Sequence, residues 1–332
     1  MILGIDIGGT TSKLGLVQDG KVVARARIST TGHADDHAFA DALAAAGLDL
    51  VRAHPTGPSR ADHIPSRADH GPPLRAVGIG APNANQLTGI IEMAPNLPWK
   101  HDVPLARMMA DRLNVPAVLG NDANAAALGE WRYGAGQGID DLLVVTLGTG
   151  VGSGFIVNGK LVLGSAGNAG ELGHMILVPG GRACTCGRNG CLEAYVSIRG
   201  MIATYMEFGG SSATEDVKTI ADRANMGDKA AISCFTRTTE HLAIGLANAV
   251  CATGPRRIVL FGGIARNGEL LMAPLRDRFQ EVLLNIYKGR VDLTVSALED
   301  DDAALLGAAA LGAMGVDELT SRGGAEGAEI QE

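Results

Sequence analysis

One design occurs twice in this sequence, and that repetition limits the possible folds more than any other feature. In each copy an apolar strand runs into a loop rich in glycine and threonine, and a second strand and a tight turn follow. The turns are Asp19-Gly20 and Asn158-Gly159, which are strong signals for a β-hairpin. Helical and strand patterns then alternate in each copy, so we expect two α/β halves of the same build.

The first of these loops has the composition of a phosphate-binding loop. Glycines let backbone N–H groups approach an anion, and hydroxyl and ammonium side chains add donors. A strand and a hairpin follow the loop, which excludes a Walker-type loop because that loop opens a helix. The same argument disfavours a dinucleotide fingerprint in the second loop. Asp6 ends the first strand and is suited to Mg²⁺, directly or through water. An ordinary hairpin loop is the alternative. The candidate phosphate ligands of this loop are Gly8, Gly9, Thr10, Thr11 and Lys13.

The stretch from Glu171 to Glu193 carries a complete set of ligands for a metal ion. One imidazole and three thiols make a closed tetrahedral set for zinc, which is typical of a structural site. Stray thiols in a loop are the alternative, and a disulfide is disfavoured because we expect a reducing cytoplasm. The four ligands are His174, Cys184, Cys186 and Cys191.

Two carboxylates flank these ligands, and neither is needed to complete the metal site. A ligating imidazole keeps its second nitrogen for a hydrogen bond. Glu171, Glu193 and that nitrogen of His174, held on a rigid loop, would suit a polyhydroxylated molecule such as a sugar. For both glutamates the alternative is a solvated surface position.

Asn121 and Asp122 follow a predicted strand at residues 115–119, where a helix begins. Ligands of open α/β sheets bind at the carboxyl ends of strands. Asp122 is therefore a candidate catalytic residue. A helix N-cap is its alternative role, and the two roles are compatible.

The composition and the charge narrow the class of protein. A chain of 332 residues can form two domains with real cores, and a net charge of −8 argues against nucleic acid as a partner. No apolar run reaches about 18 residues, so we expect no membrane span. The opening MILGIDIGG lacks a basic region and a cleavage site, which predicts a cytoplasmic protein. The hexapeptide PSRADH occurs at 58–63 and 65–70 and indicates an exposed, poorly ordered insertion over residues 54–73.

Together the two halves resemble the actin-like ATPase (ribonuclease H-like) fold, and the motifs are similar to those of the ROK family. This family (repressors, open reading frames and kinases) contains sugar kinases and sugar-responsive repressors. The resemblance covers about residues 1–314. It is carried by the metal-ligand stretch and by DIGGTTSKLGLV, GNDANAAALGE, LGTGVGSGFIVNGKLVLG and LFGGIA.

The resemblance implies an ATP-dependent hexose kinase of the glucokinase type, with Mg²⁺, a structural Zn²⁺ and assembly as a homodimer or homotetramer. Asp122 would be the catalytic base. The implied sugar ligands are Asn96, Asn121, Asp122, Glu171, His174 and Glu193. The implied nucleotide ligands of the second half are Gly148, Thr149, Gly150, Gly262 and Gly263.

We expect an N-terminal domain at residues 1–139 and a C-terminal domain at 140–301. The final helix, 302–314, would pack on the first domain, and 315–332 would form a flexible tail. N-acetylmannosamine kinase, fructokinase or another hexose kinase are alternatives within the enzymes. A sugar-responsive repressor is disfavoured, since Asp6 leaves no room for a preceding helix-turn-helix. An actin-like filament protein would have no reason to keep the metal-ligand stretch.

Overall fold

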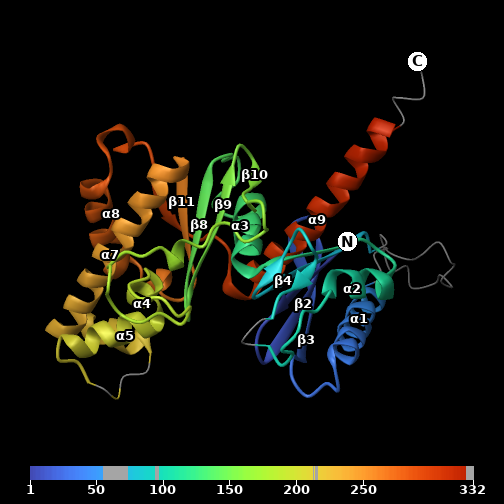
Figure 1. The fold of residues 1–332 in the computed structure, drawn as a ribbon, viewed down its shortest axis with the longest axis horizontal. Coiled ribbons are helices and arrows are strands. Elements are labelled where there is room, and N and C mark those ends of the chain that lie inside the picture. Colours follow the sequence, from blue (N-terminus) through green and yellow to red (C-terminus); the bar gives the residue numbers. More distant parts are fainter. Residues whose placement is uncertain (55–73, 94–96, 212, 214–215, 327–332) are drawn as a thin grey trace, which may run out of the picture. The chain divides into compact units, whose positions relative to one another are not determined.

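The computed structural model describes the whole chain except residues 55–73, 94–96, 212, 214–215 and 327–332. The PSRADH repeat and Asn96 therefore lie outside the described residues. The chain forms two compact units (Figure 1). Unit 1 comprises Met1–Tyr133, Leu163–Gly167 and Leu298–Glu332, and unit 2 comprises Gly134–Val162 and Asn168–Ala297. The expected domain limit at residues 139 and 140 stays a prediction.

Unit 1 is built on a five-stranded sheet in the order β3-β2-β1-β4-β7. The first three strands pair antiparallel, and β4 and β7 continue the sheet in parallel. The strands are β1 (Ile2–Ile7), β2 (Thr11–Gln18), β3 (Lys21–Ser29), β4 (Ala76–Ala81) and β7 (Ala117–Asn121), with a small hairpin of β5 (Ala84–Asn85) and β6 (Ile90–Ile91). The helices are α1 (Asp36–Ala53), α2 (Leu105–Leu113), α3 (Asp122–Tyr133) and α9 (Asp300–Glu326).

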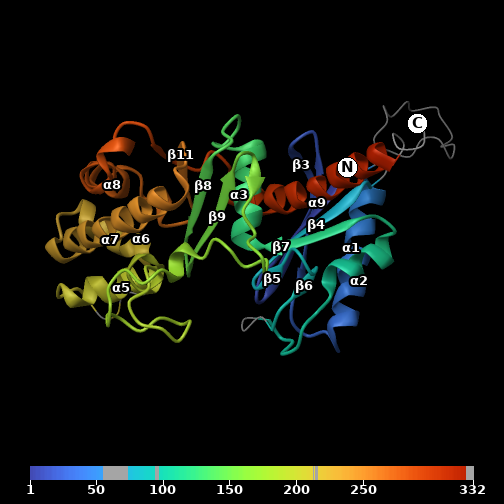
Figure 2. The same ribbon diagram turned by 45° about the horizontal axis from the view of Figure 1, so that its top comes forward.

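The two faces of this sheet differ because small and large residues alternate along its strands. Leu3, Ile5 and Ile79 share one buried core with apolar residues of α1 and α2. The other face carries glycines, and α9 lies directly on it, alongside β4 and α3 (Figure 2). A Cβ atom at Gly78 would lie only 1.7 Å from the carbonyl oxygen of Ala308. Glycine therefore permits the close approach of α9.

Unit 2 repeats the sheet in the order β10-β9-β8-β11-β12, which confirms the predicted duplication. Its strands are β8 (Leu142–Leu147), β9 (Val151–Val157), β10 (Lys160–Leu161), β11 (Arg257–Phe261) and β12 (Asp292–Val295). Its helices are α4 (Glu193–Val196), α5 (Ile198–Glu207), α6 (Val217–Asn225), α7 (Lys229–Thr253) and α8 (Glu269–Val282). Three short 3₁₀ turns complete it: η1 (Leu172–His174), η2 (Ala265–Asn267) and η3 (Asn285–Tyr287).

Both predicted hairpin turns are present. Asp19 and Gly20 have φ angles of 49° and 74°, and Asn158 and Gly159 have 50° and 71°. Two successive positive φ angles define the tight turn that matches the twist of paired strands. The choice of Asp-Gly and Asn-Gly at these turns thus follows from the positive φ angles that the turns require.

The first glycine loop is shorter than its run of candidate ligands from Gly8 to Lys13, and the second matches its candidates. Thr11 and Lys13 already belong to β2, and the ladder with β1 begins at the pair Ile7 and Ser12. In the second copy β9 begins at Val151, which pairs with Leu147. Backbone pairing therefore continues to the edge of each turn and leaves only residues 8–10 and 148–150 outside the ladders.

Ser197 separates α4 from α5: it has extended backbone and caps α5 by accepting the N–H of Gly200. The last helix differs from expectation, because it does not end at Met314 but continues to Glu326. The expected flexibility of the tail from residue 315 stays a prediction. An ion pair of 2.7 Å between Arg132 and Asp317 anchors this extension to α3.

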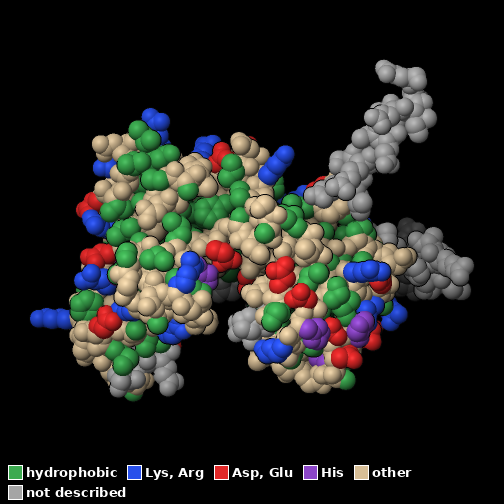
Figure 3. Space-filling model, in the orientation of Figure 1, with side chains coloured by type: hydrophobic (Ala, Val, Ile, Leu, Met, Phe, Trp, Pro, Cys, Tyr) green, Lys and Arg blue, Asp and Glu red, His purple; other side chains and the backbone are tan. Residues whose placement is uncertain are grey.

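Lysine and arginine side chains are scattered among acidic ones on the face drawn in Figure 3. Among the described helices, none is both long enough and apolar enough to cross a membrane.

Candidate functional site

The junction of β7 and α3 places the predicted catalytic residue of unit 1. Asn121 caps the helix, because its Oδ1 accepts the N–H groups of Ala123 at 2.8 Å and Asn124 at 3.4 Å. Asp122 is the first helical residue, and its Oδ1 also accepts the N–H of Ala123, at 2.8 Å. The capping role suggested for Asp122 thus falls mainly to Asn121.

The Asp122 carboxylate combines access to solvent with a raised pKa. Its side chain is exposed at the surface, yet desolvation by the surrounding protein raises the pKa above 3.8, against the hydrogen bond from Ala123. A carboxylate in this state can both meet a substrate and take up a proton.

Asp6 faces the same region from the end of β1. Desolvation raises its pKa from 3.8 to about 6, Lys13 opposes the rise, and the negative charge of Asp122 adds to it. Lys13 is directly opposite Asp6 in the antiparallel ladder, so their side chains lie on one face of the sheet. Gly80 of β4 is the parallel neighbour of Asp6. It carries no side chain that would separate Asp6 from Asp122, a role that sequence reasoning missed.

The first glycine turn is compact. The N–H of Gly8 donates to the carbonyl oxygen of Thr11 at 3.1 Å, and the carbonyl of Thr10 accepts the N–H of Thr30 at 2.9 Å. Thr10 and Thr11 are exposed. Hydroxyl groups and the N–H groups of the turn are thus placed beside the end of β1, where an anion could meet them.

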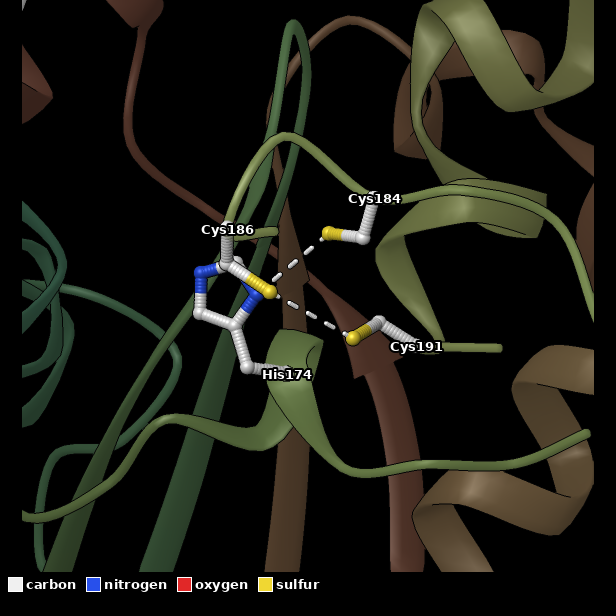
Figure 4. Close-up of side chains that lie close together, drawn as sticks. All are labelled: His174, Cys184, Cys186 and Cys191. Atoms are coloured by element: carbon white, nitrogen blue, oxygen red, sulfur yellow. Dashed lines mark hydrogen bonds between the residues drawn. The ribbon is translucent and has the colours of Figure 1, made fainter. Parts of the chain in front are cut away.

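In unit 2 the four predicted metal ligands converge (Figure 4). Their ligand atoms all lie within 4.8 Å of one another. His174 Nδ1 is 3.7 Å from Cys184 Sγ, and Cys186 Sγ is 3.6 Å from Cys191 Sγ. The residues come from η1, from the loop after it, and from the position just before α4.

These distances fit a tetrahedral zinc ion. Zinc–sulfur bonds of about 2.3 Å in a tetrahedron place two sulfur atoms about 3.8 Å apart. A disulfide would need a separation of about 2.05 Å, and all the cysteines are free. In the absence of a metal, burial and the neighbouring sulfurs raise the pKa of Cys191 and so favour its protonated form. Binding of zinc would release the thiol protons, and the site has the four donors that a closed zinc site needs.

Arg188 supports the same site, although sequence reasoning did not identify it. Its backbone N–H and its guanidinium group hydrogen-bond to Cys186 and lower the pKa of that thiol. Its Nη2 also donates to the carbonyl oxygen of His174 at 2.8 Å. Arg188 thus joins two of the ligands and adds a positive charge near the thiols. Its place between the second and third cysteines was the only signal available.

The second nitrogen of the His174 ring faces away from the sulfurs. Nε2 lies 4.0 Å from Glu171 Oε2, and the Glu171 side chain is 57% exposed. Glu171 and His174 thus present a carboxylate and an imidazole nitrogen side by side, as expected for a polar binding edge.

The burial of Glu193, which is only 8% exposed, argues against the alternative of a solvated surface position. Its Oε2 accepts the N–H of Val151 at 3.0 Å, and its Oε1 accepts the hydroxyl of Thr185 at 3.1 Å. A carboxylate has about four lone-pair sites, so Glu193 can still accept a further hydrogen bond. Its buried contacts could not be read from the sequence.

The remaining predicted residues of unit 2 lie in two turns at the ends of strands. Residues 148–150 connect β8 to β9, and the N–H of Gly148 donates to the carbonyl of Gly150 at 3.0 Å. Gly262 and Gly263 follow β11, which is the parallel neighbour of β8. A Cβ atom at Gly262 would lie 2.5 Å from the carbonyl oxygen of Leu147. The two turns are therefore neighbours at one sheet edge.

Asn85 is a further polar residue that the sequence did not single out. It is buried on β5, and its Nδ2 donates to Glu92 Oε1 at 2.7 Å and to the carbonyl of Ala166 at 2.8 Å. These bonds link β5 to Glu92 and to the segment at Ala166.

Comparison with known proteins gives a consistent result. A family model described as "ROK family" matches residues 61–314. The glucokinase of Thermotoga maritima is 34% identical over 325 residues, which are 93% of this chain and 96% of that protein. The N-acetylmannosamine kinase of Shigella flexneri is 33% identical over 311 residues, which are 93% and 97% of the two chains.

A similar solved structure is that of a ROK family glucokinase from Streptomyces griseus in complex with glucose and AMPPNP. It has 32% sequence identity and a TM-score of 0.74, and the match covers 94% of this chain and 99% of that one. The match confirms the two-domain actin-like ATPase fold that the sequence predicts.

Proposed function

Because the chain belongs to the ROK family, we propose that it is an ATP-dependent sugar kinase that phosphorylates a hexose, with glucose as the leading substrate. The observation that carries this proposal is the end of β7. There Asn121 caps α3, and Asp122 presents an accessible carboxylate with a raised pKa.

Asp122 is the proposed catalytic base. It would take the proton of the sugar hydroxyl as that oxygen attacks the γ-phosphorus of ATP, and the bond to the β,γ-bridging oxygen would break. A general base is most effective when its pKa is near the working pH. The raised pKa of Asp122 moves it in that direction.

Asp6 and the two glycine turns are proposed to bind Mg²⁺ and the ATP phosphates. Magnesium would neutralise charge on the phosphate oxygens during transfer. Asp6 offers an oxygen ligand, and residues 8–10 offer N–H groups and the Thr10 hydroxyl, with Thr11 and Lys13 at the start of β2. Residues 148–150 of unit 2 are likewise proposed to bind ATP phosphate, and Gly262 and Gly263 to lie beside the adenosine.

The sugar would be held by amide, imidazole and carboxylate groups. Phosphoryl transfer depends chiefly on positioning and electrostatics, so fixed side chains matter more than reactive ones. The Oδ1 of Asn121 is engaged in capping, which leaves its amide nitrogen as a donor. Nε2 of His174 and the carboxylate of Glu171 form a ready polar edge. The full proposed set is Asn96, Asn121, Asp122, Glu171, His174 and Glu193.

Zinc at His174, Cys184, Cys186 and Cys191 would have a structural part. All four positions of the tetrahedron are filled by protein atoms, so no water could be activated there. Bound zinc would cross-link the loop on which Glu171, His174 and Glu193 lie. Those residues themselves would contact the sugar.

N-acetylmannosamine is the second candidate substrate. The N-acetylmannosamine kinase of Shigella flexneri matches this chain almost as closely as the glucokinase of Thermotoga maritima does. The loop that holds Asn85 is where a larger 2-substituent would be accepted or refused.

A phosphorylation screen with purified protein tests the function. The protein would be mixed with Mg²⁺-ATP and with glucose, N-acetylmannosamine, mannose or fructose in turn, and ADP release would be measured. We expect the highest kcat/KM with glucose. The Asp122→Asn protein, purified in parallel, controls for contaminating kinases. Absence of sugar-dependent ADP release throughout would contradict the proposal.

We further propose that the protein works in the cytoplasm, where glucose 6-phosphate would enter glycolysis, and that it forms a homodimer or homotetramer. The family resemblance supports the assembly. Light scattering on the purified protein would give its mass.

A further inference from the structure

Val151, the first residue of β9, contacts the metal-binding loop (residues 171–193) at both of its peptide groups, by a hydrogen bond at its N–H and by close packing at its carbonyl. Its N–H donates to Glu193 Oε2 at 3.0 Å. Its carbonyl oxygen is approached by Gly173, where a Cβ atom would lie only 2.1 Å from that oxygen. Gly173 immediately precedes the ligand His174, and Glu193 lies two positions after the ligand Cys191. Both ends of the metal-binding loop therefore contact one residue, and the Glu193 end does so through a hydrogen bond.

Glu193 is in turn oriented by a residue between two metal ligands. Thr185 lies between Cys184 and Cys186, and its hydroxyl donates to Glu193 Oε1 at 3.1 Å. The two oxygens of one buried carboxylate thus join the metal-binding loop to the start of β9. The contact is tight, because a Cβ atom at Gly150 would lie 2.8 Å from Glu193 Oε2.

Val151 is also one anchor of the glycine turn at residues 148–150. At the other end of that turn, the carbonyl of Gly148 accepts the N–H of Ile198 at 2.9 Å, in the first turn of α5. Hydrogen bonds at Val151 and at Gly148 therefore fix both ends of this short turn, and they set the orientation of its N–H groups. If the hydrogen bond at Val151 is lost, the turn becomes mobile. Nucleotide binding must then order it, and the free energy needed for this ordering weakens the binding.

We propose that Thr185 is a positioning residue that acts through Glu193 to hold the turn at residues 148–150, so that occupancy of the metal site sets the affinity for nucleotide. This inference rests on the proposed function, which assigns the turn to the ATP phosphates. Thr185 itself touches neither sugar nor nucleotide in this scheme. Its hydroxyl bonds to Glu193, which bonds to Val151, so the position of the metal-binding loop affects the turn at residues 148–150.

The test is a calorimetric titration of the zinc-loaded protein with Mg²⁺-AMPPNP in the absence of sugar. Thr185→Val removes the hydroxyl with little change of shape, and Thr185→Ser restores it. Thr236→Val is the matched control, because Thr236 is exposed on α7 and its hydroxyl bonds only within that helix, to Ile232. We expect Thr185→Val to weaken nucleotide binding about fivefold, at the lower end of measured couplings between sites. Thr185→Ser and Thr236→Val should bind as the wild type does.

The same titrations after removal of zinc by a chelator complete a thermodynamic cycle. Circular dichroism would verify that the stripped protein is folded. Removal of zinc should weaken AMPPNP binding to the wild-type protein. The loss should be smaller in Thr185→Val, because the hydrogen bond between residue 185 and Glu193 is already absent there. Wild-type affinity in zinc-loaded Thr185→Val, or equal losses in the two proteins on stripping, would overturn the proposal. A wild type that binds no AMPPNP would contradict the kinase function itself, and this inference with it.

Discussion

Asp6 illustrates the conflict between function and stability at a single residue. Its pKa is raised from 3.8 to about 6, chiefly by desolvation. The folded state therefore holds the proton more tightly than the unfolded state does. Stability falls as the pH rises from 3.8 to about 6, and the full loss is present above that range.

Asp6→Asn should accordingly stabilise the protein at pH 8 in the absence of Mg²⁺. The gain should be about 2 kcal/mol, since one pKa unit corresponds to about 1.4 kcal/mol and partial exposure reduces the effect. Urea unfolding at pH 8 measures it. Near pH 3.8 and below, the gain should vanish. A variant equally stable as the wild type at pH 8 would show that burial of this charge has no net effect.

Asp122→Asn should lower kcat by about 10²–10⁴-fold, the usual contribution of a general base. The amide keeps the shape of the side chain, so sugar binding measured by calorimetry should persist. Asp111→Asn is a matched control, because Asp111 is an exposed carboxylate whose nearest partner, Arg107, is 3.8 Å away. Turnover of Asp122→Asn close to that of Asp111→Asn would remove Asp122 from the role of base.

Among the elements, the loop between η1 and α4 combines a few backbone bridges with the four candidate metal ligands. Cys191→Ala should abolish zinc binding and most of the kinase activity, because three remaining ligands hold the loop poorly. Mass spectrometry of elements in the purified protein gives the zinc content, which we expect to be one ion per wild-type chain. Cys251→Ala is the control, as this exposed cysteine lies on α7. Active wild-type protein without zinc would refute the assignment.

The contact between α3 and α9 depends on the absence of side chains. A Cβ atom at Gly307 would lie 2.4 Å from the carbonyl oxygen of Ala125. Gly307→Ala should therefore destabilise the protein by about 1–3 kcal/mol, the usual effect of overpacking. The sign is diagnostic, because the same change in an uncrowded helix stabilises by about 1 kcal/mol. Thermal unfolding measures it, and a raised Tm would mean that the two helices are not in close contact.

At the scale of the whole molecule, the PSRADH repeat is a sequence feature that the duplicated design does not require. Deleting Pro58 to His70 should change kcat/KM by less than about twofold, since surface insertions add little to the free energy of loop closure. Steady-state kinetics and a thermal melt of the shortened chain test this. A failure to fold, or a weakened sugar affinity, would assign the segment a structural or binding role.

The sequence by itself determined the duplicated α/β build, the two hairpin turns and the four metal ligands. These features depend on local chemistry: Asp-Gly and Asn-Gly adopt positive φ angles, and three thiols with an imidazole within a short stretch have few other uses. The place of Asp122 at a strand end followed from the same local pattern.

Only the tertiary structure decided the burial and the hydrogen-bond partners of the candidate site residues. The capping of α3 by Asn121 and the burial of Glu193 depend on neighbours that sequence spacing does not reveal. The length of each glycine turn depends on where the ladders β1–β2 and β8–β9 stop pairing. Local pattern specifies which conformation a residue can adopt, whereas pKa, burial and hydrogen-bond partners are set by groups distant in the chain.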